Sequence, residues 1–185
     1  MEKPKSYCEF VEQLEQSNVN RIYHDKMYGF PIDSDSELFG RLILEINQAG
    51  LSWTIILNKQ DNFRMAYSQF DIKKIANYAE EDRERLLSDA GIIRNKLKVN
   101  AVIVNAQKIL EIQEEYGSFK NWLDKNHYLS LEEWVKLFKK TFKFTGGEIT
   151  NEFLMSTGYL KGAHIETCSI YNHIIQKNPK WNEKK

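Results

Sequence analysis

The sequence predicts an all-α protein. Apolar residues recur at helical spacing through most of the 185 residues, and few stretches alternate between apolar and polar residues as strands do. Three segments also carry the capping-box pattern of a helix N-terminus, a hydroxyl residue followed three positions later by glutamate; these pairs are Ser34 with Glu37, Ser130 with Glu133, and Thr145 with Glu148. Gly117 and Gly158 lie where helices would end. The exception is a short strand-like piece, TFKFTG, at residues 141–146.

Length and composition indicate one globular domain. We expect it to span residues 1–175 as two helical lobes, followed by a polar tail, residues 176–185, that frays. The 26 basic and 26 acidic residues balance, which excludes the global charge signature of a nucleic-acid coat or a membrane binder, so that any anion-binding surface must be local. The N-terminus lacks the apolar segment of a signal peptide, and no apolar run approaches the roughly 20 residues that span a bilayer. We therefore expect a cytoplasmic protein with reduced cysteines.

An amphipathic helix is predicted from Ser36 to Ala49. Its apolar stripe consists of Leu38, Phe39, Leu42, Ile43, Ile46 and Ala49. Glu45 falls on the margin of this stripe, where periodicity leaves two interpretations open. It is either an exposed edge glutamate or a desolvated carboxylate, which costs several kcal/mol unless a partner satisfies it.

A tight turn is predicted after this helix. The pair Ala49-Gly50 ends the helix, and Ser52 is available to cap a new segment that begins near Trp53. The residues between, Gln48, Gly50 and Leu51, would then lie on a protruding turn. An apolar Leu51 in such a place either packs as a hydrophobic staple or inserts into a binding partner.

Two helices joined by a glycine turn are predicted around Gly91. The first ends in an acidic segment, residues 80–89, and the second begins with the basic residues Arg94, Lys96 and Lys98. Free amides in the first turn of the second helix, reinforced by these cations, favour an anion such as a DNA phosphate. A hairpin of this kind holds phosphates without reading bases, although most glycine-linked basic helix starts are ordinary solvated turns.

The segment from Ile93 to Glu115 is predicted to be a central buried helix. Its apolar content is high, and one helical track runs through Leu97, Ala101, Val104 and Lys108.

Two cysteines and two histidines form a candidate metal site. His164 and Cys168 are four residues apart and would share one face of a helix, while Cys8 and His24 lie near the other terminus. Cys2His2 is a standard tetrahedral zinc set, and one ion would tie the N- and C-terminal segments together. The alternative is two buried thiols and two hydrogen-bonded histidines, because the spacing of Cys8 and His24 is far from the short pairs of common zinc motifs.

Five segments in the same order, YHDKMYGFP, LEINQAGLSW, DAGIIRNKLK, FKFTG and HIETC, resemble the DNA-3-methyladenine glycosylase I family. The resemblance implies a two-lobed helix-hairpin-helix glycosylase fold and base-excision repair of alkylated DNA. It implies pocket residues at Glu45, Tyr23 and Trp53, with Glu45 and Tyr23 as the catalytic groups, and it makes Leu51 the wedge that fills the gap left by the damaged base. It also implies zinc ligands at Cys8, His24, His164 and Cys168. We therefore expect a monomeric, monofunctional enzyme with one structural zinc ion, which acts on double-stranded DNA and releases 3-methyladenine.

Three positions depart from the family pattern. The family has a tryptophan two residues after the first cysteine and another in its HDxEWG motif, where this chain has Phe10 and Tyr28. Both remain aromatic and are candidate base-binding residues, although the Tyr28 hydroxyl needs a partner. Asn20 stands where the family often has another tyrosine. These departures leave two alternatives open: a non-catalytic helix-hairpin-helix module that binds DNA or recognises damage, and a zinc-tied helical interaction protein.

The chemistry expected from these residues is selective capture of a cationic base. N3-methyladenine in DNA carries positive charge and a weakened glycosidic bond, so a strong general acid is not needed. Glu45 would accept hydrogen bonds from the exocyclic amine, Tyr23 would orient the base or the carboxylate, and Trp53 with Phe10 would stack on the ring. Asp25 adjoins His24 and leaves alternatives open: it is either the catalytic aspartate typical of the wider superfamily or, as we favour, a residue that orients a zinc-bound imidazole or caps a turn. The expected DNA contacts are Gln48, Gly50, Leu51, Gly91, Arg94, Lys96 and Lys98; their few cations predict a shallow salt dependence of affinity.

Overall fold

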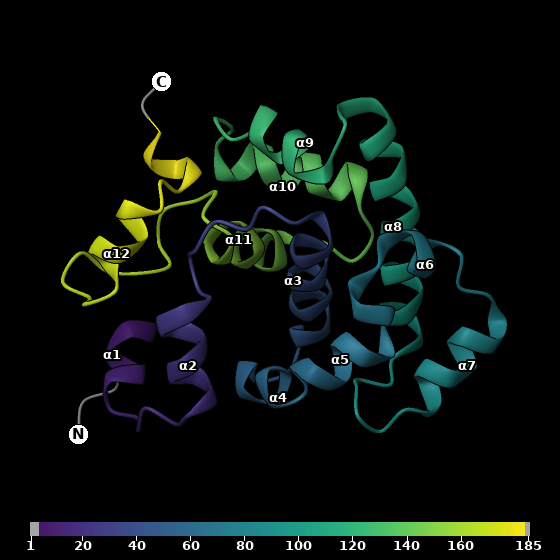
Figure 1. Ribbon diagram of the computed structural model, residues 1–185, viewed down its shortest axis with the longest axis horizontal. Coiled ribbons are helices and arrows are strands. Elements are labelled where there is room, and N and C mark those ends of the chain that lie inside the picture. The colour runs from purple at the N-terminus through teal and green to yellow at the C-terminus, as the bar shows by residue number, and fades with distance from the viewer. Residues whose placement is uncertain (1–3, 184–185) are drawn as a thin grey trace. The chain divides into compact units, whose positions relative to one another are not determined.

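The computed structural model describes residues 4–183, and every regular element in that range is a helix (Figure 1). The predicted all-α fold is confirmed for this part of the chain. The strand-like piece at residues 141–146 is a turn: Thr141 is the last residue of helix α10 (Leu131–Thr141), Phe144 has a left-handed φ of 60°, and α11 (Gly147–Ser156) follows directly. Across residues 4–183, no helix is both long and apolar enough to cross a membrane.

The chain divides into two compact units, which we describe separately. Unit 1 comprises Met1–Ile32 and Leu154–Lys185, and unit 2 comprises Asp33–Phe153. The helices of unit 1 are α1 (Tyr7–Glu12), α2 (Val19–Lys26), α12 (Tyr171–Gln176) and the 3-10 helix η2 (Lys180–Asn182). Unit 2 contains α3 (Asp35–Gln48), α4 (Trp53–Asn58), α5 (Gln60–Ala66), η1 (Ser68–Phe70), α6 (Ile72–Ala76), α7 (Glu80–Ser88), α8 (Lys96–Tyr116), α9 (Phe119–Lys125), α10 and most of α11.

The central helix of unit 2 is α8, which packs against α3, α6, α7 and α9. It begins at Lys96, later than predicted, because Asn95 is its N-cap and accepts the N–H groups of Leu97 and Lys98. Gly117 ends it as predicted, with a φ of 84°. Of the helical track named from the sequence, Ala101 is buried, whereas Leu97 is 69% exposed and Val104 is also exposed. The buried face carries Lys98, Ala101, Val102, Asn105, Ala106, Ile109 and Ile112.

Helix α3 follows its predicted pattern, and its middle is buried on all sides. The stripe residues from Leu38 to Ile46 are buried. Ser34 caps the helix by accepting the N–H of Glu37, but the Glu37 carboxylate pairs with Arg64, so only half of the predicted capping box is present. A Cβ atom on Gly40 would lie 2.3 Å from Cδ2 of Phe70, so the close packing of η1 against α3 requires glycine at this position.

The two remaining capping boxes differ in outcome. At Ser130 and Glu133 both reciprocal hydrogen bonds are present, as predicted. At Thr145 the prediction is wrong, because α11 begins at Gly147 and the Thr145 hydroxyl donates to the carbonyls of Phe138 and Phe142. Thr145 therefore fixes the turn between α10 and α11.

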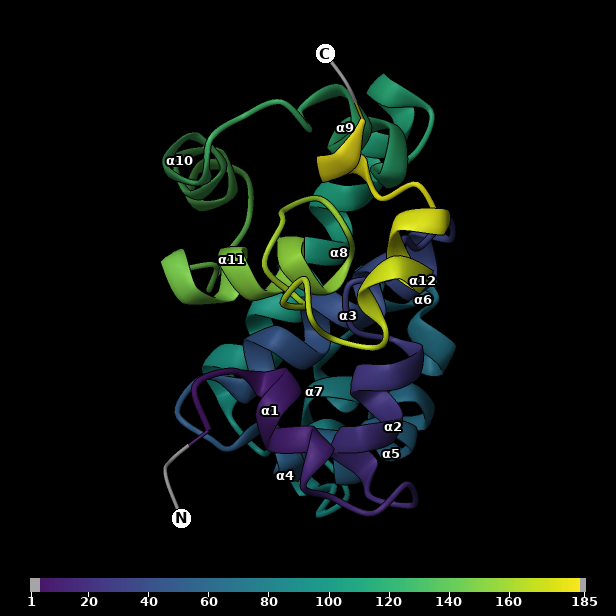
Figure 2. The same ribbon diagram turned by 90° about the vertical axis from the view of Figure 1, so that its left-hand side faces the viewer.

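Unit 1 joins segments from the two ends of the sequence. Helices α1 and α2 lie side by side in both views (Figure 1 and Figure 2). The Gly29 N–H donates to the Ser156 carbonyl at 2.9 Å, and the Trp181 N–H donates to the Gly158 carbonyl at 3.3 Å. The described part of the predicted polar tail thus includes a short 3-10 helix; residues 184–185 lie outside the described range.

Candidate functional site

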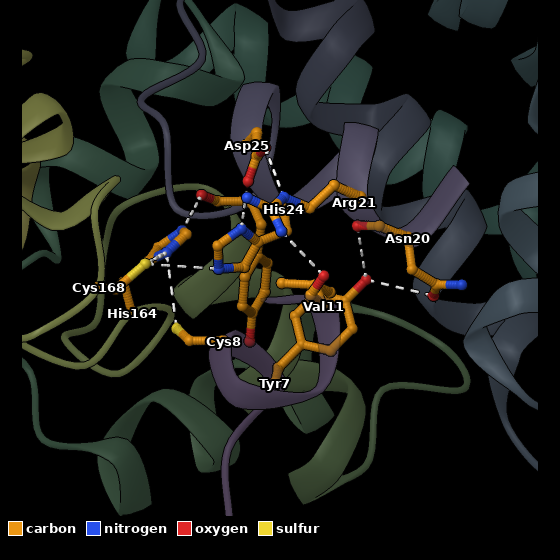
Figure 3. Close-up of polar contacts among 10 residues, drawn as sticks. Tyr7, Cys8, Val11, Asn20, Arg21, His24, Asp25, His164 and Cys168 are labelled. Carbon is orange, nitrogen blue, oxygen red and sulfur yellow. Dashed lines mark hydrogen bonds and ion pairs between the residues drawn. The ribbon is translucent and has the colours of Figure 1, made fainter. Parts of the chain in front are cut away.

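Four metal-ligating side chains come together in unit 1 (Figure 3). Cys8 lies on α1 and His24 on α2, while His164 and Cys168 lie in the segment between α11 and α12. All four are buried, and their ligand atoms lie within 4.8 Å of one another. These are the four residues that the sequence predicted, but His164 and Cys168 are not on a helix. A turn, in which the Cys168 N–H donates to the Ile165 carbonyl, brings them together.

The distances within this cluster suit a tetrahedral ion. Sγ of Cys168 lies 3.4 Å from Nδ1 of His164 and 3.6 Å from Nε2 of His24, and Sγ of Cys8 lies 3.8 Å from Nδ1 of His164. A zinc ion bonded to sulfur at about 2.3 Å and to nitrogen at about 2.0 Å would hold such atom pairs about 3.5 Å apart. The four residues can therefore bind one metal ion with little rearrangement.

Both histidines are oriented by their second ring nitrogen. Nε2 of His164 donates to the Tyr28 carbonyl at 2.8 Å, which leaves Nδ1 as the ligand atom. Nδ1 of His24 lies 2.7 Å from a carboxylate oxygen of Asp25, which leaves Nε2 as the ligand atom. Asp25 is held in turn by Nε of Arg21 at 2.9 Å (Figure 3). Burial alone would raise the pKa of Asp25, but the hydrogen bonds from His24 and Arg21 lower it below its usual value, so that it stays ionised.

Burial sets the ionisation of two of the four side chains in the cluster. Burial lowers the pKa of His164 to about 4, so its imidazole is neutral and able to ligate at neutral pH. Burial, together with the neighbouring Cys168, raises the pKa of the Cys8 thiol to about 11. A buried thiol of this kind ionises readily only when a bound cation compensates its charge.

In unit 2, Glu45 lies in the last turns of α3 and is 3% exposed. Of the two interpretations that periodicity left open, the structure shows the buried carboxylate. Arg41, one helical turn earlier, is also buried. This buried cation was not predicted from the sequence, although the spacing of four residues between Arg41 and Glu45 was a visible signal. Trp53 is the first residue of α4 and is partly buried.

The aromatic residues predicted near the N-terminus form a cluster in unit 1. The rings of Tyr23 and Tyr28 lie 5.5 Å apart, and both residues are buried, whereas Phe10 is exposed. Tyr7, which was not predicted as a member of this cluster, stacks on Phe10 at 6.0 Å and meets Tyr28 edge-on at 5.5 Å. Its hydroxyl donates to Asn20, at the position where the family often has a tyrosine.

The predicted turn after α3 is present in unit 2. Gly50 is exposed with a φ of 80°, and a Cβ atom there would meet nothing within 4 Å, so this glycine is needed for its backbone conformation. The Leu51 N–H donates to the Gln48 carbonyl at 2.7 Å, and Nε2 of Gln48 donates to the Leu51 carbonyl at 2.9 Å. These two bonds present Leu51, which is partly exposed, on a stable turn. Ser52 precedes α4, although its side chain makes no capping bond.

Two predictions about the hairpin are corrected by the structure. Lys98 is not a surface cation: it is 5% exposed, and its Nζ donates to the carbonyls of Asn47 and Ala49, each at 2.8 Å. Burial lowers the pKa of this ammonium, and the carbonyl end of α3 stabilises it. The amides of the first turn of α8 are not all free either, because Asn95 accepts those of Leu97 and Lys98.

The Gly91 turn is held by one side chain of the hairpin and by a lysine from the junction of α4 and α5. The Gly91 N–H donates to Asp89 at 2.7 Å, and the Gly91 carbonyl accepts Nζ of Lys59 at 3.2 Å. Arg94 and Lys96 remain exposed, as predicted.

A family model described as methyladenine glycosylase matches residues 13–133, more than half of the chain. The chain belongs to the methyladenine glycosylase family. DNA-3-methyladenine glycosylase 1 of Escherichia coli (strain K12) is 35% identical over 177 residues, which cover 85% of this chain and 94% of the relative. A DNA-3-methyladenine glycosylase of Haemophilus influenzae is 37% identical over 107 residues, 57% of this chain and 58% of the relative.

Solved structures of methyladenine glycosylases share this fold. A crystal structure of 3-methyladenine DNA glycosylase I is 32% identical, with a TM-score of 0.77 over 84% of this chain and 96% of the other. The Staphylococcus aureus enzyme, whose structure concerns recognition of 3-methyladenine, is 28% identical, with a TM-score of 0.77 over 84% and 93% of the two chains. The family resemblance inferred from five sequence segments is thus confirmed. The match to the family model covers Tyr23, His24, Glu45 and Trp53, whereas Cys8, Phe10, His164 and Cys168 lie outside it.

Proposed function

We propose that this protein is a base-excision repair glycosylase that flips 3-methyladenine out of double-stranded alkylated DNA and releases it by hydrolysis of the glycosidic bond. Membership of the methyladenine glycosylase family supports this activity. The observation that carries the proposal is the buried carboxylate of Glu45 on α3. A buried carboxylate favours a partner that donates hydrogen bonds and carries positive charge, because Coulomb interactions are far stronger in the protein interior than in solvent.

The reaction needs recognition more than acid catalysis. Methylation at N3 leaves the base cationic and the glycosidic bond weak, so a site that binds the flipped cation and admits water is sufficient. We propose that Glu45 accepts hydrogen bonds from the exocyclic amine of the base and that Trp53 stacks on its ring. The roles of Tyr23, Phe10 and Tyr28 in unit 1 are proposed from the family resemblance, with Tyr23 orienting the base or the carboxylate and Phe10 and Tyr28 offering aromatic surface.

We propose zinc as the ion of the Cys8, His24, His164 and Cys168 cluster. Two thiolates and two imidazoles are a common zinc set, and four protein ligands leave no open position for chemistry. The ion would therefore be structural, holding together the N- and C-terminal segments of unit 1. We also propose that unit 2 contacts DNA as a helix-hairpin-helix protein, through Gln48, Gly50, Leu51, Gly91, Arg94 and Lys96, with Leu51 as the wedge.

The activity is tested by incubating the purified protein with methylated duplex DNA and measuring free 3-methyladenine by chromatography. Release of 3-methyladenine, with no release of adenine from an unmethylated duplex, is the expected result. A protein that binds an abasic-site duplex but leaves 3-methyladenine in place at saturation is a non-catalytic DNA-binding module, and the enzymatic proposal is then wrong.

The buried bonds of Lys98 predict a coupling to the wedge. Lys98 holds the carbonyls of Asn47 and Ala49, which lead into the Gly50-Leu51 turn, so Lys98→Met should weaken binding to an abasic-site duplex by loosening that turn. In a double-mutant cycle with Leu51→Ala the effects should not add, with a coupling energy of about 0.5–3 kcal/mol. Lys96→Met, which removes an exposed cation two residues earlier, is the matched control and should add to Leu51→Ala. Additive effects of Lys98→Met would contradict this positioning role.

A further inference from the structure

A hollow of about 530 Å³ opens to solvent at the turn between α10 and α11. We name it the lysine hollow after Lys139 and Lys143, which line it together with Phe144; Phe142 and Ile149 are buried beneath. Neither lysine forms an ion pair with a described residue. Residues 136–149 contain four lysines and one glutamate, so positive charge accumulates locally on a chain whose charges balance overall.

The backbone of this turn is held in place from the core. Asn105 of α8 is 0% exposed; its Nδ2 donates to the Lys143 carbonyl at 3.0 Å, and its Oδ1 accepts the Lys143 N–H at 2.7 Å. The next residue, Phe144, has a φ of 60° and is 39% exposed. A left-handed backbone is unfavourable for an aromatic residue and persists only where its surroundings impose it. The clamp by Asn105, with the Thr145 hydroxyl bonds beyond it, therefore presents an aromatic ring to solvent at an energetic cost.

Lys98 links the lysine hollow to the turn that carries Leu51. Nζ of Lys98 lies 5.9 Å from the centre of the Phe144 ring, and the same Nζ bonds the carbonyls of Asn47 and Ala49. Lys98 thus connects three segments of unit 2: the turn between α10 and α11 (Figure 2), the start of α8, and the end of α3.

We infer that the lysine hollow is a further DNA-contact surface, in which Lys139 and Lys143 bind phosphates of the strand beside the Leu51 wedge and Phe144 packs on a sugar or base. The inference rests on the proposed function, since the wedge is part of it. Exposed cations interleaved with an exposed aromatic ring suit a nucleic-acid strand, which offers phosphates and flat apolar faces at short intervals. The hollow also supplies exposed cations in place of Lys98, which is buried and donates its hydrogen bonds to backbone carbonyls, so that it cannot contact DNA.

The test compares two double variants that remove the same charge. Lys139→Gln with Lys143→Gln changes the lysine hollow, and Lys136→Gln with Lys140→Gln changes exposed lysines of the same helix that do not line it. Affinity for a duplex with a stable abasic-site analogue is measured at several salt concentrations. The hollow variant should make the negative slope of log affinity against log salt shallower by about 2, and the control pair should leave the slope unchanged. Phe144→Gly, which the left-handed backbone accepts, should weaken affinity severalfold at an unchanged slope.

The outcomes separate this inference from the proposed function. If both double variants lower the slope equally, only net charge matters and the hollow is not a contact; if neither does, DNA does not reach it. In both cases the wild-type protein still binds the duplex and excises 3-methyladenine, so only the inference is overturned. A wild-type protein that does not bind the duplex overturns both.

Discussion

Glu45→Gln is expected to lower the rate of 3-methyladenine excision about 10- to 100-fold, because hydrogen bonds to a charged group contribute about 1.5–3 kcal/mol and every 1.4 kcal/mol is a factor of ten. Glutamine keeps the shape of the side chain but removes the negative charge that favours a cationic base. Glu45 is buried on α3, so solvent does not screen its charge. Single-turnover excision from a methylated duplex measures the effect.

The same helix offers a matched control. Glu37 lies in the first turn of α3 and pairs with both terminal nitrogens of Arg64, at 2.8 Å and 2.6 Å, on the partly exposed side. Glu37→Gln removes the same charge but should leave excision within about twofold of wild type, because surface ion pairs contribute little. Affinity for an abasic-site duplex should survive in both variants. Excision that is unchanged in Glu45→Gln would rule out its recognition role.

Loss of the metal is expected to have the largest effect on stability. Cys168→Ser removes one of the four buried side chains that we propose as zinc ligands, and structural zinc contributes about 10–16 kcal/mol to folding in small zinc domains. Even a third of that, at about 2–4 °C per kcal/mol for a chain of this size, lowers the melting temperature by roughly 10 °C. Calorimetry with metal analysis by mass spectrometry measures both the shift and the stoichiometry, without any assay of activity.

A histidine outside the cluster provides the control for this experiment. His173 on α12 is exposed and packs edge-on against Phe30 at 5.6 Å. His173→Gln should keep one zinc ion per chain and a melting temperature close to wild type. The metal assignment fails if wild-type protein with both cysteines reduced contains no zinc, or if Cys168→Ser retains it in full.

Much of the local structure could be predicted because its causes lie within a few residues. The caps at Ser34 and Ser130 and the end of α8 at Gly117 follow from hydrogen bonds and backbone conformations that neighbouring residues decide. The apolar stripe of α3 could be predicted for the same reason, because its periodicity is a local property of the sequence. Local patterns also misled where two segments interact: the Thr145 hydroxyl bonds to carbonyls of α10 and does not cap α11.

The residues of the candidate metal site were predicted from the sequence, but the contacts that orient them were not. Cys8, His24, His164 and Cys168 were identified from residue type and from resemblance, and the structure gathers all four. Their second partners, Asp25 and the Tyr28 carbonyl, orient the two rings. The contact between His164 and Tyr28 joins residues 136 positions apart, and periodicity carries no information about it.

The sequence by itself determined the helical class, several helix ends, the turn at Gly50 and the family. Only the tertiary structure decided which charged side chains are buried. Periodicity left Glu45 on the margin of a helix face, and the basic residues around Lys98 indicated a surface cation, yet both side chains are buried. The reason is physical: whether a charged side chain is buried depends on the partners that distant segments bring to it. For Lys98 those partners are the carbonyls at the end of α3, about fifty residues earlier in the chain.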